Sequence, residues 1–203
     1  MRRALLLGLW LAASLGQAAE PEKAWAFSLS AYAYDVPAGE DDFVNPGCTA
    51  DRGRLHLEAR YNYESIGAAS LWGGANFSVG KSWVFDSTVM VGGVFGDIEG
   101  IAPGFRLSLT HDWLEITSEA EYYIDNHDHE ENYFYTWSEI AGYPLDWLRF
   151  GLAVQRTRAY DTDLDIQRGP FVGLTYKSFD VAAYVFNPGS DDATYTLGLG
   201  FDF

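Results

Sequence analysis

Cysteine, basic residues and long apolar runs are all scarce in this chain of 203 residues. Its 1 cysteine, Cys48, excludes an internal disulfide, so stability must come from burial and backbone pairing. Beyond residue 20 no stretch approaches the roughly 18 uncharged apolar residues that a membrane-spanning helix needs. With 13 Lys and Arg against 29 Asp and Glu, the formal net charge is −16. Such an acidic surface repels nucleic acid, and we expect no nucleic-acid partner.

The first residues have the order of a secretory signal peptide. Two arginines, an apolar run and small residues follow one another: Arg2, Arg3, Ala4 to Leu15, Gly16, Ala18 and Ala19. We expect cleavage after Ala18 or Ala19, so that residues 1–19 are a signal peptide and residues 20–203 form one domain. Cys48 lies too far from this site to carry a lipid anchor.

Apolar residues recur at every second position through most of the remaining chain, which is the period of a β-strand and not of a helix. Between Arg54 and Tyr63, for example, leucine, alanine and tyrosine alternate with charged or polar residues. The pattern predicts about twelve strands. They lie near residues 24–34, 42–50, 53–63, 66–79, 83–95, 103–110, 113–124, 132–143, 146–158, 168–177, 179–186 and 193–203. Pro46 and Gly47 interrupt the second of them, so about ten strands is the fallback.

Two kinds of connection alternate between these strands. Short turns are each followed by an aromatic residue: Trp83, Trp113, Trp147 and Phe179. Longer connections are polar and mostly acidic: residues 35–41, 96–104, 125–131, 160–169 and 187–192. This alternation is typical of a closed antiparallel up-and-down transmembrane β-barrel, with short periplasmic turns and longer outer loops. The four aromatic residues are then expected to form a girdle at the membrane interface.

The charged faces of the strands are expected to face the lumen of the barrel, and the apolar faces the lipid. The lumen residues would be Arg54, His56, Glu58, Arg60, Asp86, Arg106, Glu115, Glu119, Glu121, Glu139 and Arg149, with Tyr135 and Trp137 among them. One interpretation is that these charges pair and fill the barrel as a structural brace. The other is a constriction with opposed acidic and basic walls that selects small solutes.

The last strand adds a resemblance. Tyr195, Leu197, Leu199, Phe201 and Phe203 alternate with small or polar residues, and the sequence ends on Phe203. This resembles the terminal-strand signal of Gram-negative outer-membrane proteins. The resemblance implies the barrel-assembly machinery, outer-membrane lipid and lipopolysaccharide as partners. The stretches ADRGRLHLEARYNYE, GGVFGDIEGIAPGF, EAEYYID, YTWSE and DIQRGPF also resemble a family of uncharacterised proteobacterial outer-membrane proteins. That likeness implies the fold and no particular activity.

An outer-membrane lipid-modifying hydrolase is the alternative from another functional class. It would need a nucleophile, a base and an orienting group close together. His56 with Glu58, or the loop that carries His127 and His129, would be at its centre. No lipid-facing histidine, however, accompanies Ser87, Ser118 or Ser138. We therefore assign no catalytic residue and expect a protein that is not an enzyme.

The acidic connection 125–131 has ligand types suited to a divalent cation. Asp125, His127, Asp128 and His129 are the weak metal candidates, although such a segment is ordinarily only solvated. We predict no metal and no cofactor. A surface receptor or adhesin is a third alternative, which the shortness of the outer connections disfavours.

Overall fold

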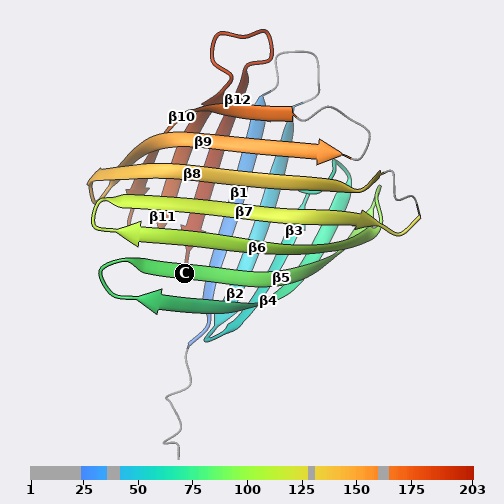
Figure 1. The fold of residues 1–203 in the computed structure, drawn as a ribbon, viewed down its shortest axis with the longest axis horizontal. Helices are drawn as coiled ribbons and strands as arrows, with labels where there is room; N and C mark the ends of the chain where they lie inside the picture. The colour runs from blue at the N-terminus through green and yellow to red at the C-terminus, as the bar shows by residue number, and fades with distance from the viewer. Residues whose placement is uncertain (1–23, 36–41, 128–130, 160–164) are drawn as a thin grey trace, which may run out of the picture.

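Backbone pairing closes the chain into a barrel (Figure 1). The computed structural model describes residues 24–35, 42–127, 131–159 and 165–203, so the predicted signal peptide, residues 1–19, lies outside it. The strands are β1 (Ala26–Asp35), β2 (Phe43–Arg52), β3 (Leu55–Tyr61), β4 (Ala68–Gly80), β5 (Val84–Gly96), β6 (Gly100–His111), β7 (Leu114–Asp125), β8 (Tyr133–Leu145), β9 (Leu148–Ala159), β10 (Asp165–Tyr176), β11 (Phe179–Phe186) and β12 (Thr194–Asp202). Within the described chain, no helix combines the length and hydropathy needed to cross a membrane.

Each strand pairs with its neighbours in sequence, and β1 pairs with β12 to close the ring. All of these pairings are antiparallel, and in Figure 1 the nearer strands, β4 to β9, cross the farther ones steeply. Closure leaves no unpaired sheet edge, which is the condition for a β-sheet in hydrocarbon. The predicted fold class, a closed antiparallel barrel of twelve strands, is confirmed.

Two prolines within strands, Pro46 of β2 and Pro103 of β6, lie where a neighbouring ladder is incomplete. Pro46 pairs with Ala31 of β1, whereas the β2–β3 ladder begins only at Gly47. Within the β6–β7 ladder, Ala102 and Pro103 are left out of the register. A proline lacks the N–H that a ladder requires, so both strands stay continuous only because one side is unpaired there.

Two predicted outer connections are therefore wrong in length. The segment 96–104 was expected to be a loop, but β6 begins at Gly100 and pairs with β5 from there. Similarly, the expected loop 160–169 ends earlier, because β10 begins at Asp165. At the opposite end the connections are tight turns, as at Gly53, whose φ of 64° favours glycine.

Alternate residues of each strand face the interior and the outer wall. In β3, His56, Glu58 and Arg60 are buried, whereas Leu55 and Leu57 are 45% and 42% exposed. The same holds around the ring, where leucine, valine, isoleucine and aromatic side chains cover the exposed wall. A continuous apolar surface of this kind is expected of a wall that faces lipid.

Large interior side chains lie across glycines on the adjacent strand. Trp72 is paired with Gly92 in the β4–β5 register, and a Cβ added at Gly92 would lie 2.5 Å from indole carbons. Arg149 likewise covers Gly173, its partner in the β9–β10 register. Because these bulky groups rest close to the wall, space is left in the middle of the barrel.

Candidate functional site

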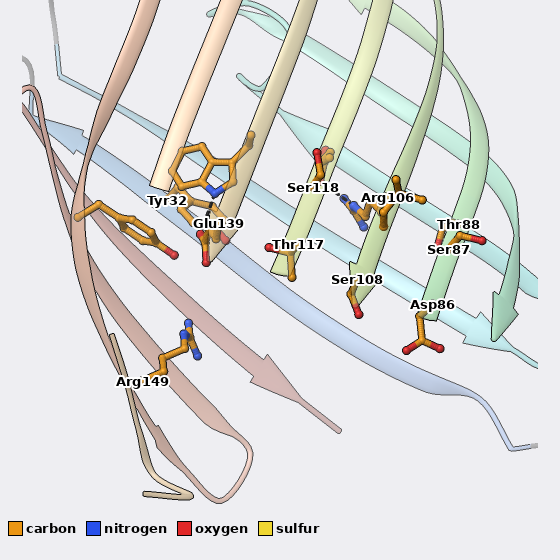
Figure 2. Close-up of a pocket in the computed structure, with 14 residues that line it drawn as sticks. Tyr32, Asp86, Ser87, Thr88, Arg106, Ser108, Thr117, Ser118, Glu139 and Arg149 are labelled. Carbon is orange, nitrogen blue, oxygen red and sulfur yellow. Dashed lines mark hydrogen bonds and ion pairs between the residues drawn. The ribbon is translucent and has the colours of Figure 1, made fainter. Parts of the chain in front are cut away.

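Two of the cavities in the barrel interior each have a volume of about 360 Å³. The first is shown in Figure 2, with Arg149 and Glu139 on one side and Asp86 on the other. The second is lined mainly by β1, β2, β3, β7 and β8. Both are lined by Tyr32, Arg106, Glu119 and Trp137. These four side chains therefore form the place where the two cavities meet, and we call them the constriction.

The constriction is continuous with a buried cluster of charges centred on Arg60. The guanidinium of Arg60 donates to Glu58 at 2.9 Å and to Glu121 at 3.0 Å, and it lies 3.0 Å from Glu119. Arg106 bridges the same acids, at 2.6 Å from Glu58 and 2.7 Å from Glu119. Two arginines thus tie β3, β6 and β7 together through three carboxylates. Paired charges of this kind satisfy the requirement for burying ionised groups.

His56 extends this cluster toward the short-turn end. Its Nδ1 lies 2.8 Å from Asp51 and its Nε2 lies 3.3 Å from Glu58. With both ring nitrogens against carboxylates, neither is directed at a hydroxyl nucleophile. On the outer wall, Ser118 and Ser138 hydrogen-bond to each other at 2.9 Å. The triad arrangement that the hydrolase alternative requires is not formed by these described residues.

Arg149, the third interior arginine, forms a pair of its own. It donates two hydrogen bonds to Asp180, one of 2.7 Å, and Thr175 donates to the same carboxylate at 2.8 Å. This bidentate geometry is the strong form of an arginine–carboxylate contact. The positive charge of Arg149 at the edge of the first cavity is therefore already matched.

Three interior carboxylates, in contrast, have no ion pair with any residue that the structure describes. Asp86 lines the first cavity. Glu139 lines it too and accepts a hydrogen bond from Trp137 Nε1 at 2.7 Å. Glu115 accepts one from the hydroxyl of Tyr143. The indole of Trp137 and the hydroxyl of Tyr143 are uncharged donors, so they do not neutralise the carboxylates that they contact. The unpaired charge in this part of the lumen is therefore negative.

One predicted lumen residue lies elsewhere. Arg54 is exposed in the turn between β2 and β3, with its guanidinium 5.4 Å from the ring centre of Phe77 on the outer wall. The prediction was wrong because β3 begins at Leu55 and not at residue 53, so the alternation does not extend into the turn.

Sequence analysis also missed several interior acids. Glu64 lies in the connection after β3, accepting hydrogen bonds from Ser70 at 2.6 Å and Trp72 at 3.2 Å. No periodic pattern marks a connection residue that folds inward. Asp51 and Asp180 sit beside a turn, where the register is hard to place from the sequence.

The aromatic residues after the short turns are exposed at that end of the barrel. Their exposed fractions are Trp83 49%, Trp113 64%, Trp147 54% and Phe179 58%. At the closing seam, Phe27 and Phe203 exchange two backbone hydrogen bonds of 3.0 Å. The ring of Phe201 stacks between Phe203 and Phe179, and Tyr195 is exposed farther along β12.

Part of the candidate metal segment is described. The carboxylate of Asp125 is buried and accepts hydrogen bonds from the Tyr123 hydroxyl at 2.8 Å and the His127 backbone N–H at 2.7 Å. Asp128 and His129 lie outside the described residues. Among the residues that the structure describes, no three His, Cys, Asp or Glu side chains form a group that could hold a metal ion.

Comparison with solved structures places this geometry among known barrels. The KdgM porin matches over 87% of this chain and 99% of its own, with a TM-score of 0.61 and 12% identity. A second structure, the KdgM porin in complex with disordered oligogalacturonate, has the same coverage and TM-score at 10% identity. The Acinetobacter baumannii outer membrane protein Omp33 matches 88% of this chain and 98% of its own, with a TM-score of 0.48 and 10% identity.

No family model and no curated protein sequence matches the chain. At these identities the likeness concerns the fold alone, and the fold is that of the KdgM porin. The closed ring, the apolar outer wall and the charged interior agree with that comparison. The chain is therefore an outer-membrane β-barrel, similar in its fold to the KdgM porin.

Proposed function

We propose that this barrel is a narrow channel for small solutes and that it favours cations over anions. The observation that carries the proposal is the unequal matching of charge in the lumen. Arg60, Arg106 and Arg149 are each held in ion pairs, whereas Asp86 and Glu139 face the first cavity without one among the described residues. Ionisable groups in a narrow pore select permeating ions by their sign.

The side chains at the constriction support selection by size as well as by charge. At the constriction, the ion pair of Arg106 with Glu119 is accompanied by the rings of Tyr32 and Trp137, whose centres lie 5.9 Å apart. A solute that moves from one cavity to the other passes these groups. Small hydrated cations suit such a passage better than large or anionic solutes do.

The contrast with the KdgM porin sharpens this proposal. One structure of that porin holds oligogalacturonate, whose sugar units carry carboxylates. In the present chain such a ligand would meet unmatched carboxylates and arginines already committed to ion pairs. We therefore expect oligogalacturonate to bind weakly here, and we do not carry that ligand over.

Planar-bilayer recording tests both parts of the proposal. The refolded mature chain should give stable open levels, and a potassium chloride gradient should give a reversal potential of cation-selective sign. An Asp86→Asn/Glu139→Gln variant should lose most of this selectivity while still conducting. The matched control is Asp146→Asn, at an exposed position in a short turn. Silent bilayers would contradict the channel and favour the plugged, structural barrel, whereas anion-selective conductance would contradict only the charge preference.

A further inference from the structure

Two arginines stand on the outer wall of the barrel, near the end that carries the long connections. Arg156 of β9 is paired with Ile166, and Arg168 of β10 is paired with Val154. Both side chains are exposed, and they lie on the same face as Val154 and Ile166. The two arginines are thus diagonal neighbours across adjacent strands, a relation that places side chains about 7–8 Å apart at their bases.

Their surroundings are those of a lipid-facing wall. Val154 and Ile166 are 38% and 43% exposed, and Leu152 of β9 and Phe134 of β8 are exposed on the same side. A guanidinium on such a wall is costly at the bilayer midplane and costs little near an interface. Arg156 and Arg168 lie near the ends of their strands and have long flexible side chains. Both guanidinium groups can therefore reach the level of the lipid headgroups.

The distribution of the remaining basic side chains makes this pair distinct. Of those that the structure describes, Arg60, Arg106 and Arg149 are in the lumen. The others lie at or beside the short turns: Arg52, Arg54, Lys81 and Lys177. Arg156 and Arg168 are therefore the described cations on the outer wall at the long-connection end. Neither guanidinium has an ion pair or hydrogen bond with another described residue.

The end with long connections faces outward in bacterial barrels of this type, so this pair meets the outer leaflet. That leaflet consists largely of lipopolysaccharide, a glycolipid whose headgroup carries phosphates. A guanidinium presents a planar fork of donors that matches phosphate oxygens bidentately. On a chain with a formal net charge of −16, a local cationic pair is also where an anionic headgroup meets the least repulsion.

From this placement, we propose that Arg156 and Arg168 form a binding site for the phosphate groups of lipopolysaccharide on the outer face of β9 and β10. The site is independent of the channel proposal, because neither arginine lines the lumen cavities. Its ligand is a phosphorylated glycolipid in the adjacent leaflet, held by charge at its headgroup and by apolar contact with the wall below.

Native mass spectrometry of the refolded mature chain can test the site, with bisphosphorylated lipid A and fully dephosphorylated lipid A as probes. We expect phosphorylated lipid A to be retained at least about tenfold more strongly, as charged hydrogen bonds predict. Arg156→Gln/Arg168→Gln should lose most of that difference. Lys81→Gln/Lys177→Gln, at the opposite end, makes the same charge change and should keep it.

Three results would overturn the assignment. Equal retention of the two lipids by the wild-type chain would mean that acyl contacts alone hold the lipid. Unchanged phosphate dependence in the double arginine variant would place the site elsewhere. Displacement of lipid A by equimolar inorganic phosphate would also refute it, because the site would then recognise the free anion. Circular dichroism and heat-modifiable migration in gels establish that each variant is folded.

Discussion

Replacing Arg60 with methionine should be among the most damaging single changes in the interior. The Arg60 side chain is 2% exposed, and it lies within 4.0 Å of Glu58, Glu64, Glu119 and Glu121. Glu58 and Glu119 keep Arg106 after the change. Glu121 does not, because Arg60 is its ion-pair partner among the described residues and its own side chain is 1% exposed. Glu64, whose side chain is 0% exposed, likewise has Arg60 as its ion-pair partner among the described residues, at 3.9 Å. Two buried carboxylates are therefore left without a counterion, although Glu64 keeps its hydrogen bonds from Ser70 and Trp72.

Removing one partner of a buried ion pair costs about 3–5 kcal/mol. That loss lowers the folding equilibrium constant by about two to four orders of magnitude. Methionine retains most of the stem packing against Trp72 and Tyr63, whose ring centres lie 4.4 and 4.3 Å from the guanidinium carbon. The loss is therefore assigned chiefly to the buried carboxylates that lose their counterion.

Equilibrium urea unfolding into lipid vesicles, followed by tryptophan fluorescence, measures this difference. The decisive comparison is the double variant Arg60→Met/Glu121→Met, which removes both partners of the 3.0 Å ion pair and leaves Glu64 with its hydrogen bonds from Ser70 and Trp72. We expect it to recover more than half of the stability that the single variant loses, since replacing a whole buried pair is often close to neutral. A single variant that costs less than about 1 kcal/mol, or a double variant no better than the single, would refute the reasoning.

Two further predictions test the interior packing and the outer wall. Gly92→Ala should destabilise the barrel by about 1–3 kcal/mol, because its Cβ would collide with the buried indole of Trp72. Gly93→Ala, whose Cβ meets nothing within 4 Å, should change stability by less than about 0.5 kcal/mol in the same unfolding assay. Cys48, exposed on the outer face of β2, should react in vesicles with a lipid-soluble maleimide and much more slowly with a charged, impermeant one. Equal rates would contradict the lipid-facing position.

The strands could be predicted from the sequence because every strand of a barrel wall follows the same alternation of residues. Each residue faces either lipid or lumen, so alternation such as that of Leu55, His56, Leu57 and Glu58 survives in nearly every strand. The rule failed where a turn begins, as at Arg54, and where a proline imitates a loop, as at Pro103.

The charge pairs of the lumen could not be read in the same way. Arg60 reaches Glu121 across 61 positions of sequence, and the contact depends on the stagger of β3 against β7 around the ring. Alternation indicates that both side chains face inward, but it does not indicate their positions along the barrel axis. Glu64 gives no signal at all, since it joins the cluster from a connection.

The glycines opposite Trp72 and Arg149 have a consequence for how sequences with this fold can diverge. Each bulky side chain and its glycine occupy one shared volume, so the two positions form a single unit of variation. Shortening Trp72 would make room for a side chain at Gly92, and only then would growth at Gly92 be tolerated. In related chains we expect the large residue and the small residue of such a pair to change together, or to swap positions between the two strands. The width of the lumen would then be conserved even where its individual residues are not.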